Sequence, residues 1–468
     1  MKSLPALVLA FCFSLISISP MAAQTGTGIA AGLWTGTLAI RQETEGRNDP
    51  GSDTRKTGSG NTAGQGTSLQ ASISLRLLDL GLGALLDIPE QSMFGYPLDQ
   101  VSWTGTRLSF SFGALGPGED LVFEGIYSAS LKAVIGTARS KSWKGSFRLM
   151  PAPEEDYPGE TRIWVETDRD RLPGTLLIPE VSSAFPAIVI FLSGSGTSDR
   201  NGNNFSVPGR SDSLALLAKA LASRSIASFR YDKRGSGEAY SMAESGMNVS
   251  LDEHIEDAIR IVGDFIRSGL YSRIIVAGMN EGAWIGAAAL NRLEEEGLFA
   301  DGLAALAVSG ERPLDLLQTS LEALSPALRE EARSITEAIL SDRLFPEPSA
   351  QLADFFAPQR IRWLKSWLAF DPVREFAGVE SVLLFIYGQK DLQVSRPAFE
   401  KLLDARPHAA ARIIPSMNYA LKQVDSETEN FDSFTNPEYP VPDALADLLA
   451  AFARARPAPV GSLPYVRE

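Results

Sequence analysis

A series of apolar runs that alternate with helical segments constrains the fold of the C-terminal two-thirds of this chain most strongly. Runs such as Ala187–Leu192 and Leu303–Val308 are apolar throughout, without polar residues at every second position. Such strands are buried on both faces, and strands separated by helices form parallel sheets. The pattern predicts an α/β fold with a mostly parallel, eight-stranded sheet. Its strands are expected at 161–166, 174–178, 187–192, 226–231, 273–277, 303–308, 382–387 and 411–414.

Helical segments fill the intervals between these strands and after the last one. They are expected at 213–223, 252–268, 283–296, 398–404 and 443–456. Between the sixth and seventh strands, residues 314–369 form a long, mainly helical insertion that contains Trp363 and Trp367. An insertion at this point is expected to form a lid over the active-site face of the sheet.

The N-terminal third of the chain has a different pattern. In residues 24–150, short apolar segments are separated by Gly and Pro, which predicts an all-β barrel or sandwich domain. A segment rich in Gly, Ser, Thr and Asn, residues 43–67, is expected to be a loop within it. Residues 151–159 contain three prolines and three acidic residues and are predicted to link this domain to an α/β domain at 160–456. Residues 457–468 are expected to be a C-terminal tail.

The first residues resemble an export signal. Lys2 is followed by an apolar run to Ile18 and by small residues up to Ala23, which predicts a signal peptide at 1–23 and a periplasmic or extracellular protein. The run is too short to span a bilayer, which takes about 20 residues. No membrane span is therefore expected in the mature chain. The single cysteine, Cys12, lies in this run, so the mature chain has no disulfide, thiol nucleophile or cysteine-bound zinc.

Charge and histidine content exclude further classes of function. The formal net charge of −14 disfavours nucleic acid and anionic membranes as partners. A small-molecule ligand remains open, and no metal or other cofactor is expected. The only histidines are His254 and His408. His254 begins a helix beside two acidic residues and His408 precedes the eighth strand, so both are expected at the surface.

One motif indicates where chemistry would be located. The strand at 273–277 leads into Gly278-Met279-Asn280-Glu281-Gly282 and then into a helix. A strand, G-x-x-x-G and a helix in succession are typical of a nucleophile elbow, in which a strained turn exposes its middle residue above the sheet. Other motifs follow the third, fourth, seventh and eighth strands: SGSGTSDR at 193–200, RYDKRG at 230–235, GQKDLQV at 388–394 and PSMNYALK at 415–422.

In this order, the five motifs resemble the α/β-hydrolase superfamily, and in particular exported serine hydrolases grouped with dienelactone hydrolases and serine aminopeptidases. The sequence around Gly36 and Gly125 is similar to a lipocalin-like domain that precedes some exported bacterial hydrolases. The hydrolase resemblance implies that the nucleophilic serine would stand at Asn280, the acid at Asp391 and the histidine at Tyr419. Only the acid is retained.

The resemblance also implies the groups that would bind an oxyanion. These are the backbone N–H of Glu281 and one N–H near Ser195 or Gly196. Because they belong to the backbone, the replacements at the other positions do not remove them. Four charged residues in the flanking motifs are expected to form ion pairs that hold the loops, and they are Asp199, Arg200, Asp232 and Arg234.

The two replacements remove the family's acyl-transfer chemistry. Asn280 has no hydroxyl to attack a carbonyl, and Tyr419 is a phenol, whose pKa is ordinarily about 10, so it cannot act as a neutral base at pH 7. Loss of the serine or histidine of a triad costs on the order of 10⁶ in turnover. Asn280 nevertheless suits a strained elbow, since asparagine tolerates positive φ better than most residues.

Three functions remain open from the sequence. The first is a pseudo-hydrolase that binds a small acyl-type ligand or a partner without turnover. The second is an active esterase or peptidase that uses non-standard residues, such as water activated by Asp391. The third is an envelope interaction protein that acts through its β-domain.

Overall fold

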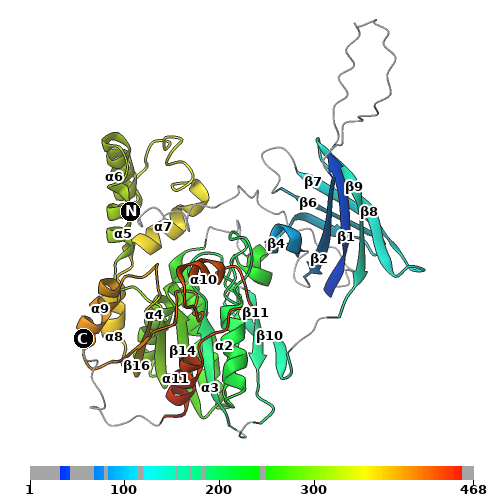
Figure 1. Cartoon of the computed structure of the whole chain (residues 1–468). Helices are drawn as coiled ribbons and strands as arrows, with labels where there is room; N and C mark the ends of the chain where they lie inside the picture. The colour runs from blue at the N-terminus through cyan, green and yellow to red at the C-terminus, as the bar shows by residue number, and fades with distance from the viewer. Residues whose placement is uncertain are drawn as a thin grey trace, which may run out of the picture. The chain divides into compact units, whose positions relative to one another are not determined.

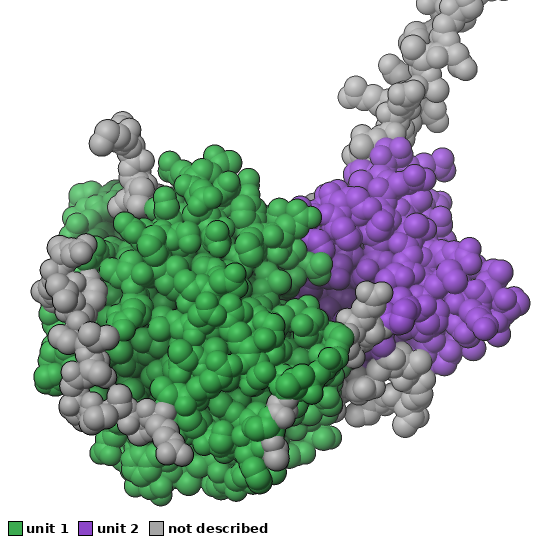
Figure 2. Space-filling model, turned by 60° about the horizontal axis from the view of Figure 1, so that its bottom comes forward, with its two compact units in different colours: residues 1–17, 156–468 green, residues 18–155 purple. Residues whose placement is uncertain are grey.

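The computed structural model describes residues 32–42, 68–78, 83–113, 120–153, 157–168, 170–181, 183, 185–242 and 249–455. These residues form two compact units, one up to residue 153 and the other from residue 157 on, which are coloured separately in Figure 2. The predicted signal peptide, the loop at 43–67 and the C-terminal tail lie outside the described residues. No helix in the described ranges has both the length and the apolar character needed to cross a membrane.

The N-terminal unit is a single antiparallel sheet of nine strands in the order β4-β3-β2-β1-β9-β8-β7-β6-β5 (Figure 1). Its strands are β1 (Gly32–Gln42), β2 (Ser68–Leu77), β3 (Ala84–Ile88), β4 (Met93–Pro97), β5 (Asp99–Trp103), β6 (Arg107–Phe112), β7 (Leu121–Ser128), β8 (Ala133–Arg139) and β9 (Trp143–Pro151). The prediction of a separate all-β unit is confirmed. Because β9 pairs with β1, all nine strands belong to one sheet.

Aromatic rings fill one side of this sheet. Phe110 and Phe123 stack with their ring centroids 4.3 Å apart, and Phe147 lies 5.4 Å from Phe123. Gly125 and Gly136 are directly opposite each other on β7 and β8. A Cβ on Gly136 would lie 2.2 Å from the Glu124 carbonyl oxygen and 2.5 Å from the Phe147 ring. Glycine is therefore required where this ring crosses the strand pair.

The C-terminal unit is built on a mixed sheet in the order β10-β11-β13-β12-β14-β15-β16-β17. The first three strands pair antiparallel and the rest pair parallel. The strands are β10 (Glu160–Glu166), β11 (Arg171–Leu177), β12 (Ala187–Leu192), β13 (Ala227–Tyr231), β14 (Arg273–Met279), β15 (Gly302–Leu306), β16 (Leu383–Gly388) and β17 (Ala410–Ile414). The sequence predicted a mostly parallel sheet with helices, and the structure has a mixed sheet with helices.

Helices cover both faces of this sheet (Figure 1). They are α2 (Ser213–Ala222), α3 (Leu251–Ser268), α4 (Glu281–Glu295), α8 (Pro372–Gly378), α9 (Arg396–Ala405), α10 (Glu427–Asp432) and α11 (Asp443–Arg454). Alternate side chains of β12 enter different cores: Ile188 and Ile190 pack with α3 and α4, while Val189 and Phe191 pack with α2 and α11. This burial on both faces is the physical reason for the continuous apolar runs.

The insertion between β15 and β16 has a small core of its own. It contains α5 (Pro313–Leu321), α6 (Pro326–Leu340), the short 3-10 helix η3 (Pro358–Arg360) and α7 (Ile361–Ala369). Ile335, Phe356 and Leu364 are buried together in it, and Trp367 contacts both this cluster and the main core. Trp367 thus joins the insertion to the sheet domain.

Truncation of the aromatic core should destabilise the N-terminal unit. Phe123 is fully buried, so Phe123→Ala should lower the free energy of unfolding of this unit by about 3 to 5 kcal/mol. The matched control is Ile126→Ala on the same strand, where the side chain is 59% exposed and the change should stay within about 0.5 kcal/mol. Urea titration followed by near-UV circular dichroism measures both. Equal effects of the two substitutions would contradict this account of the core.

Candidate active site

The elbow connects β14 to α4, and close backbone packing determines its shape. Asn280 has φ 46° and ψ −111°, a strained conformation, and its N–H donates to the Leu306 carbonyl at 2.8 Å. A Cβ on Gly278 would lie 2.3 Å from the Ala283 nitrogen. A Cβ on Gly282 would lie 2.2 Å from the Leu192 carbonyl oxygen. Both glycines of the motif are therefore required for α4 to start this close to β12.

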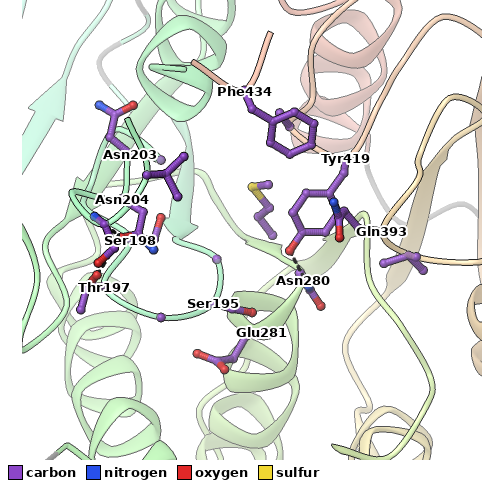
Figure 3. Close-up of a pocket in the computed structure, with 18 of the residues that line it drawn as sticks. Ser195, Thr197, Ser198, Asn203, Asn204, Asn280, Glu281, Gln393, Tyr419 and Phe434 are labelled. Atoms are coloured by element: carbon purple, nitrogen blue, oxygen red, sulfur yellow. Dashed lines mark hydrogen bonds between the residues drawn. The ribbon is translucent and has the colours of Figure 1, made fainter. Parts of the chain in front are cut away.

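Asn280 and Tyr419 are in direct contact. The Asn280 amide Nδ2 donates a hydrogen bond to the Tyr419 phenol oxygen at 2.5 Å (Figure 3). The Tyr419 ring stacks on Phe434, with centroids 6.2 Å apart and an interplanar angle of 13°. The structure thus brings together the residues at two of the three predicted triad positions, although 139 positions separate them in the chain.

A buried amide holds the loop that carries Tyr419. Asn418 is fully buried, and its Nδ2 donates to Asn430 Oδ1 at 3.0 Å and to Ser433 Oγ at 2.8 Å. Its Oδ1 accepts from the Lys422 backbone N–H at 3.0 Å. Buried polar groups that are fully hydrogen-bonded make a loop rigid. The position of Tyr419 is therefore set by the residue that precedes it.

Asp391 lies in the neighbouring loop but does not complete a triad. The two loops are joined by a hydrogen bond from the Lys390 N–H to the Met417 carbonyl at 2.9 Å. Asp391 Oδ1 accepts from the backbone N–H groups of Gln393 and Val394, at 2.7 and 2.8 Å. Within the described part of the chain Oδ2 has no hydrogen-bond partner, and burial raises the pKa of this carboxyl to about 7. Asp391 is thus not hydrogen-bonded to Tyr419.

The predicted oxyanion groups line one cavity. Ser195 and Gly196 belong to the loop after β12, and Glu281 is the first residue of α4, where backbone N–H groups lack partners within the helix. The Nζ of Lys233 donates a hydrogen bond to the Gly194 carbonyl at 2.5 Å and so holds this loop. It is braced internally by Ser193, whose hydroxyl donates to the Ser198 carbonyl at 2.9 Å.

The Glu281 side chain has a feature that the motif did not reveal. It is buried, and its Oε1 lies 3.7 Å from Lys233 Nζ. Burial raises the pKa of Glu281 and lowers the pKa of Lys233, while the attraction between the two groups opposes both shifts. Glu281 Oε2 is buried without a hydrogen-bond partner among the described residues. The contact between Glu281 and Lys233 could not be predicted from the sequence.

Three of the four charged residues of the flanking motifs form the expected ion pairs, and Asp199 is held instead by backbone hydrogen bonds. Arg200 pairs with Asp232 at 2.6 Å, and Arg234 pairs with Asp257 at 2.7 Å. Asp199 accepts from the backbone N–H groups of two residues in its own loop, at 2.8 and 2.9 Å. These contacts of Asp199, Arg200, Asp232 and Arg234 hold the loops in place.

The expectation of a surface position for His254 is wrong. His254 is 7% exposed and lines the cavity, whereas His408 is exposed as expected. The reason is that α7 of the insertion packs over the start of α3. Ser366 Oγ accepts from the Leu251 N–H at 2.8 Å, and Arg362 pairs with Glu253 at 3.0 Å. Contacts between residues more than 100 positions apart therefore bury the first turn of α3.

The cavity itself has a volume of about 360 Å³ and lies within the C-terminal unit. Asn280, Glu281 and Tyr419 line it on the side of the sheet, and Trp363 and Trp367 of α7 line it from the insertion. The two tryptophan rings stack with centroids 5.1 Å apart. The described residues contain no cluster of His, Cys, Asp and Glu suited to hold a metal ion.

Comparisons with known proteins add little beyond the fold. No family model and no curated relative matches the sequence. Among solved structures, Est1E from Butyrivibrio proteoclasticus, solved with ferulic acid, is similar over 61% of this chain and 97% of its own, with 12% identity and a TM-score of 0.40. A puromycin-hydrolyzing peptidase of Mycobacterium tuberculosis is similar over 82% of this chain and 52% of its own, with 14% identity and a TM-score of 0.41.

A proline iminopeptidase from Mycobacterium smegmatis is similar over 63% of this chain and 99% of its own, with 17% identity and a TM-score of 0.39. The function of this chain must therefore be argued from the site itself.

The buried carboxyl of Asp391 should make stability depend on pH. Its pKa of about 7 lies above the ordinary value near 3.9, so the folded protein loses stability as pH rises from about 4 to about 7. Asp391→Asn keeps an oxygen acceptor but removes the charge. The free energy of unfolding of the variant minus that of the unmodified protein should therefore increase from pH 4 to pH 8, by on the order of 1 to 4 kcal/mol.

Urea titrations at both pH values measure this gain. Asp425→Asn, at an exposed aspartate, is the control and should show no such gain. If the stability difference between Asp391→Asn and the unmodified protein is the same at pH 4 and at pH 8, Asp391 does not titrate as described.

Proposed function

We propose that this chain is an exported pseudo-hydrolase that binds a small acyl-type ligand in the cavity under residues 314–369 and does not hydrolyse it. The observation that carries the proposal is the hydrogen bond between Asn280 and Tyr419. These residues occupy the places that the resemblance to α/β hydrolases gives to the nucleophile and the base. The pattern of the first 23 residues supports export.

Neither residue of this pair can perform acyl transfer. The Asn280 amide nitrogen is delocalised into its carbonyl and donates its hydrogen to Tyr419, so it does not present a lone pair to a substrate. Tyr419 accepts that hydrogen bond, and it is not hydrogen-bonded to Asp391. The relay from acid to base to nucleophile, which triad hydrolases require, is therefore interrupted at each step.

The features that shape a binding site are retained. The elbow keeps the strained turn and both glycines, and the first turn of α4 opens into the cavity. The lining combines the aromatic rings of Tyr419, Trp363 and Trp367 with polar side chains, and most of its exposed surface is apolar. A concave, mostly apolar site with a small number of polar groups is typical of small-molecule binding.

Restoring both residues tests this function. The unmodified protein should not hydrolyse p-nitrophenyl butyrate above background, and Asn280→Ser with Tyr419→His should raise the rate by about 10²-fold or more. Either single change should do little, because a serine without imidazole is not activated and imidazole without serine has nothing to deprotonate. The two effects should be strongly non-additive. Initial rates at pH 8 measure all four proteins.

Asn280→Ala with Tyr419→His is the control, since it adds the base without a nucleophile. A serine-directed phosphonate probe should label the double variant alone. If the unmodified protein hydrolyses the ester at a rate that survives Asn280→Ala but falls with Asp391→Asn, the chain is an active hydrolase and the proposal is wrong. A folded double variant that stays inert would mean that the site has diverged beyond its triad positions.

A further inference from the structure

The cavity has a second polar region, formed by His254 and Glu281. Both residues line the cavity, and they are 7% and 1% exposed. His254 Nδ1 and Glu281 Oε2 are buried, and neither has a hydrogen-bond partner in the part of the chain that the structure describes. In Figure 3 the Glu281 side chain points away from Tyr419, toward the side of the pocket below Ser195. The Glu281 side chain is therefore directed away from the Asn280–Tyr419 pair.

Unpartnered buried polar atoms are unfavourable unless something binds them. Leaving a buried donor or acceptor without a hydrogen bond costs about 1 to 3 kcal/mol, and such groups are rare in folded proteins. Neighbouring side chains of the described residues do not supply hydrogen-bond partners for these two atoms. Glu281 Oε1 faces Lys233, which leaves Oε2 open, and Arg234 is already paired with Asp257 and Asp170. A ligand group that enters the cavity would supply such partners.

The charges around this region indicate what that group is. Burial, together with the positive charges of Lys233 and Arg234, keeps the pKa of His254 well below its usual range, so its imidazole is neutral at pH 7. A neutral imidazole offers one donor and one acceptor. Lys233 lies beside the Glu281 carboxyl and Arg234 is paired with Asp257 and Asp170, so these groups together carry no net positive charge that would attract an anionic ligand. The Glu281 carboxyl disfavours a ligand carboxylate, although Arg360 also lines the cavity and would favour one.

We propose that the cavity binds an uncharged ligand whose apolar body lies against Trp363 and Trp367 and whose hydroxyl group hydrogen-bonds with His254 and Glu281. A hydroxyl both donates and accepts, so it satisfies either atom without adding a charge. The inference rests on the proposed function, that this cavity binds without turnover, and it adds the class of ligand.

Four probes with one aromatic body test the ligand class. They are 2-phenylethanol, its methyl ether, 2-phenylethylamine and phenylacetate, none of which has an ester to hydrolyse. Dissociation constants come from NMR titration of the mature protein at pH 7. The alcohol should bind about fivefold more tightly than the methyl ether, because the ether cannot donate to Glu281. It should also bind more tightly than the amine and the carboxylate.

Two variants assign that preference to residues. His254→Phe and Glu281→Gln should each reduce the alcohol's advantage over the ether to less than about twofold. The matched controls are His408→Phe and Glu322→Gln, at exposed residues of the same types, and they should leave the advantage unchanged. Two site variants are needed because Glu281→Gln leaves Lys233 buried without a charged partner, which can prevent folding. Circular dichroism of each variant checks that it is folded.

The outcomes separate this inference from the proposed function. If the probes bind but the alcohol has no advantage, or if the amine or phenylacetate binds most tightly, the inference is overturned while binding without turnover stands. An alcohol preference that survives both folded variants also overturns it. If no probe binds up to its solubility limit, the proposed binding role falls as well. Turnover is measured separately, with the ester substrate.

Discussion

The close approach of α4 to β12 is the constraint on which the rest of the site depends. Gly282 lies against the Leu192 carbonyl at a spacing that no Cβ could share. This contact places the start of α4 at the end of β14 and forces Asn280 into a strained turn that points into the cavity. Asparagine is among the few non-glycine residues that tolerate positive φ. The strained elbow is therefore compatible with asparagine at its middle position.

Two polar regions share this cavity, and they differ in how their hydrogen bonds are satisfied. Asn280 and Tyr419 are hydrogen-bonded to each other, and the buried amide of Asn418 holds the loop that carries Tyr419. The region around His254 and Glu281 has unpartnered atoms, although Lys233 lies beside Glu281. Buried groups of this second kind reduce stability unless a ligand binds them. The first region supports the proposal that acyl transfer is absent, and the second is where recognition is proposed.

The sheet of the C-terminal unit could be predicted from local sequence because each strand contributes to two cores. Alternate residues of β12 enter opposite cores, so the strand is apolar throughout and easy to recognise. In the N-terminal unit, β3, β4 and β5 are hard to recognise from the sequence because each has only five residues and polar or glycine positions interrupt it. The choice between one sheet and two depended on the β1–β9 pairing, which no local pattern encodes.

The sequence by itself predicted the elbow, the order of the loop motifs and the residues at the three triad positions, because all of these are read from adjacent positions. Only the tertiary structure decided that Asp391 bonds to its own loop, that Asn280 donates to Tyr419, and that His254 is buried. The physical reason is distance along the chain. His254 is buried by α7, whose Ser366 and Arg362 contact the start of α3 from more than 100 residues away. Such contacts exist only once the insertion has packed against the sheet domain.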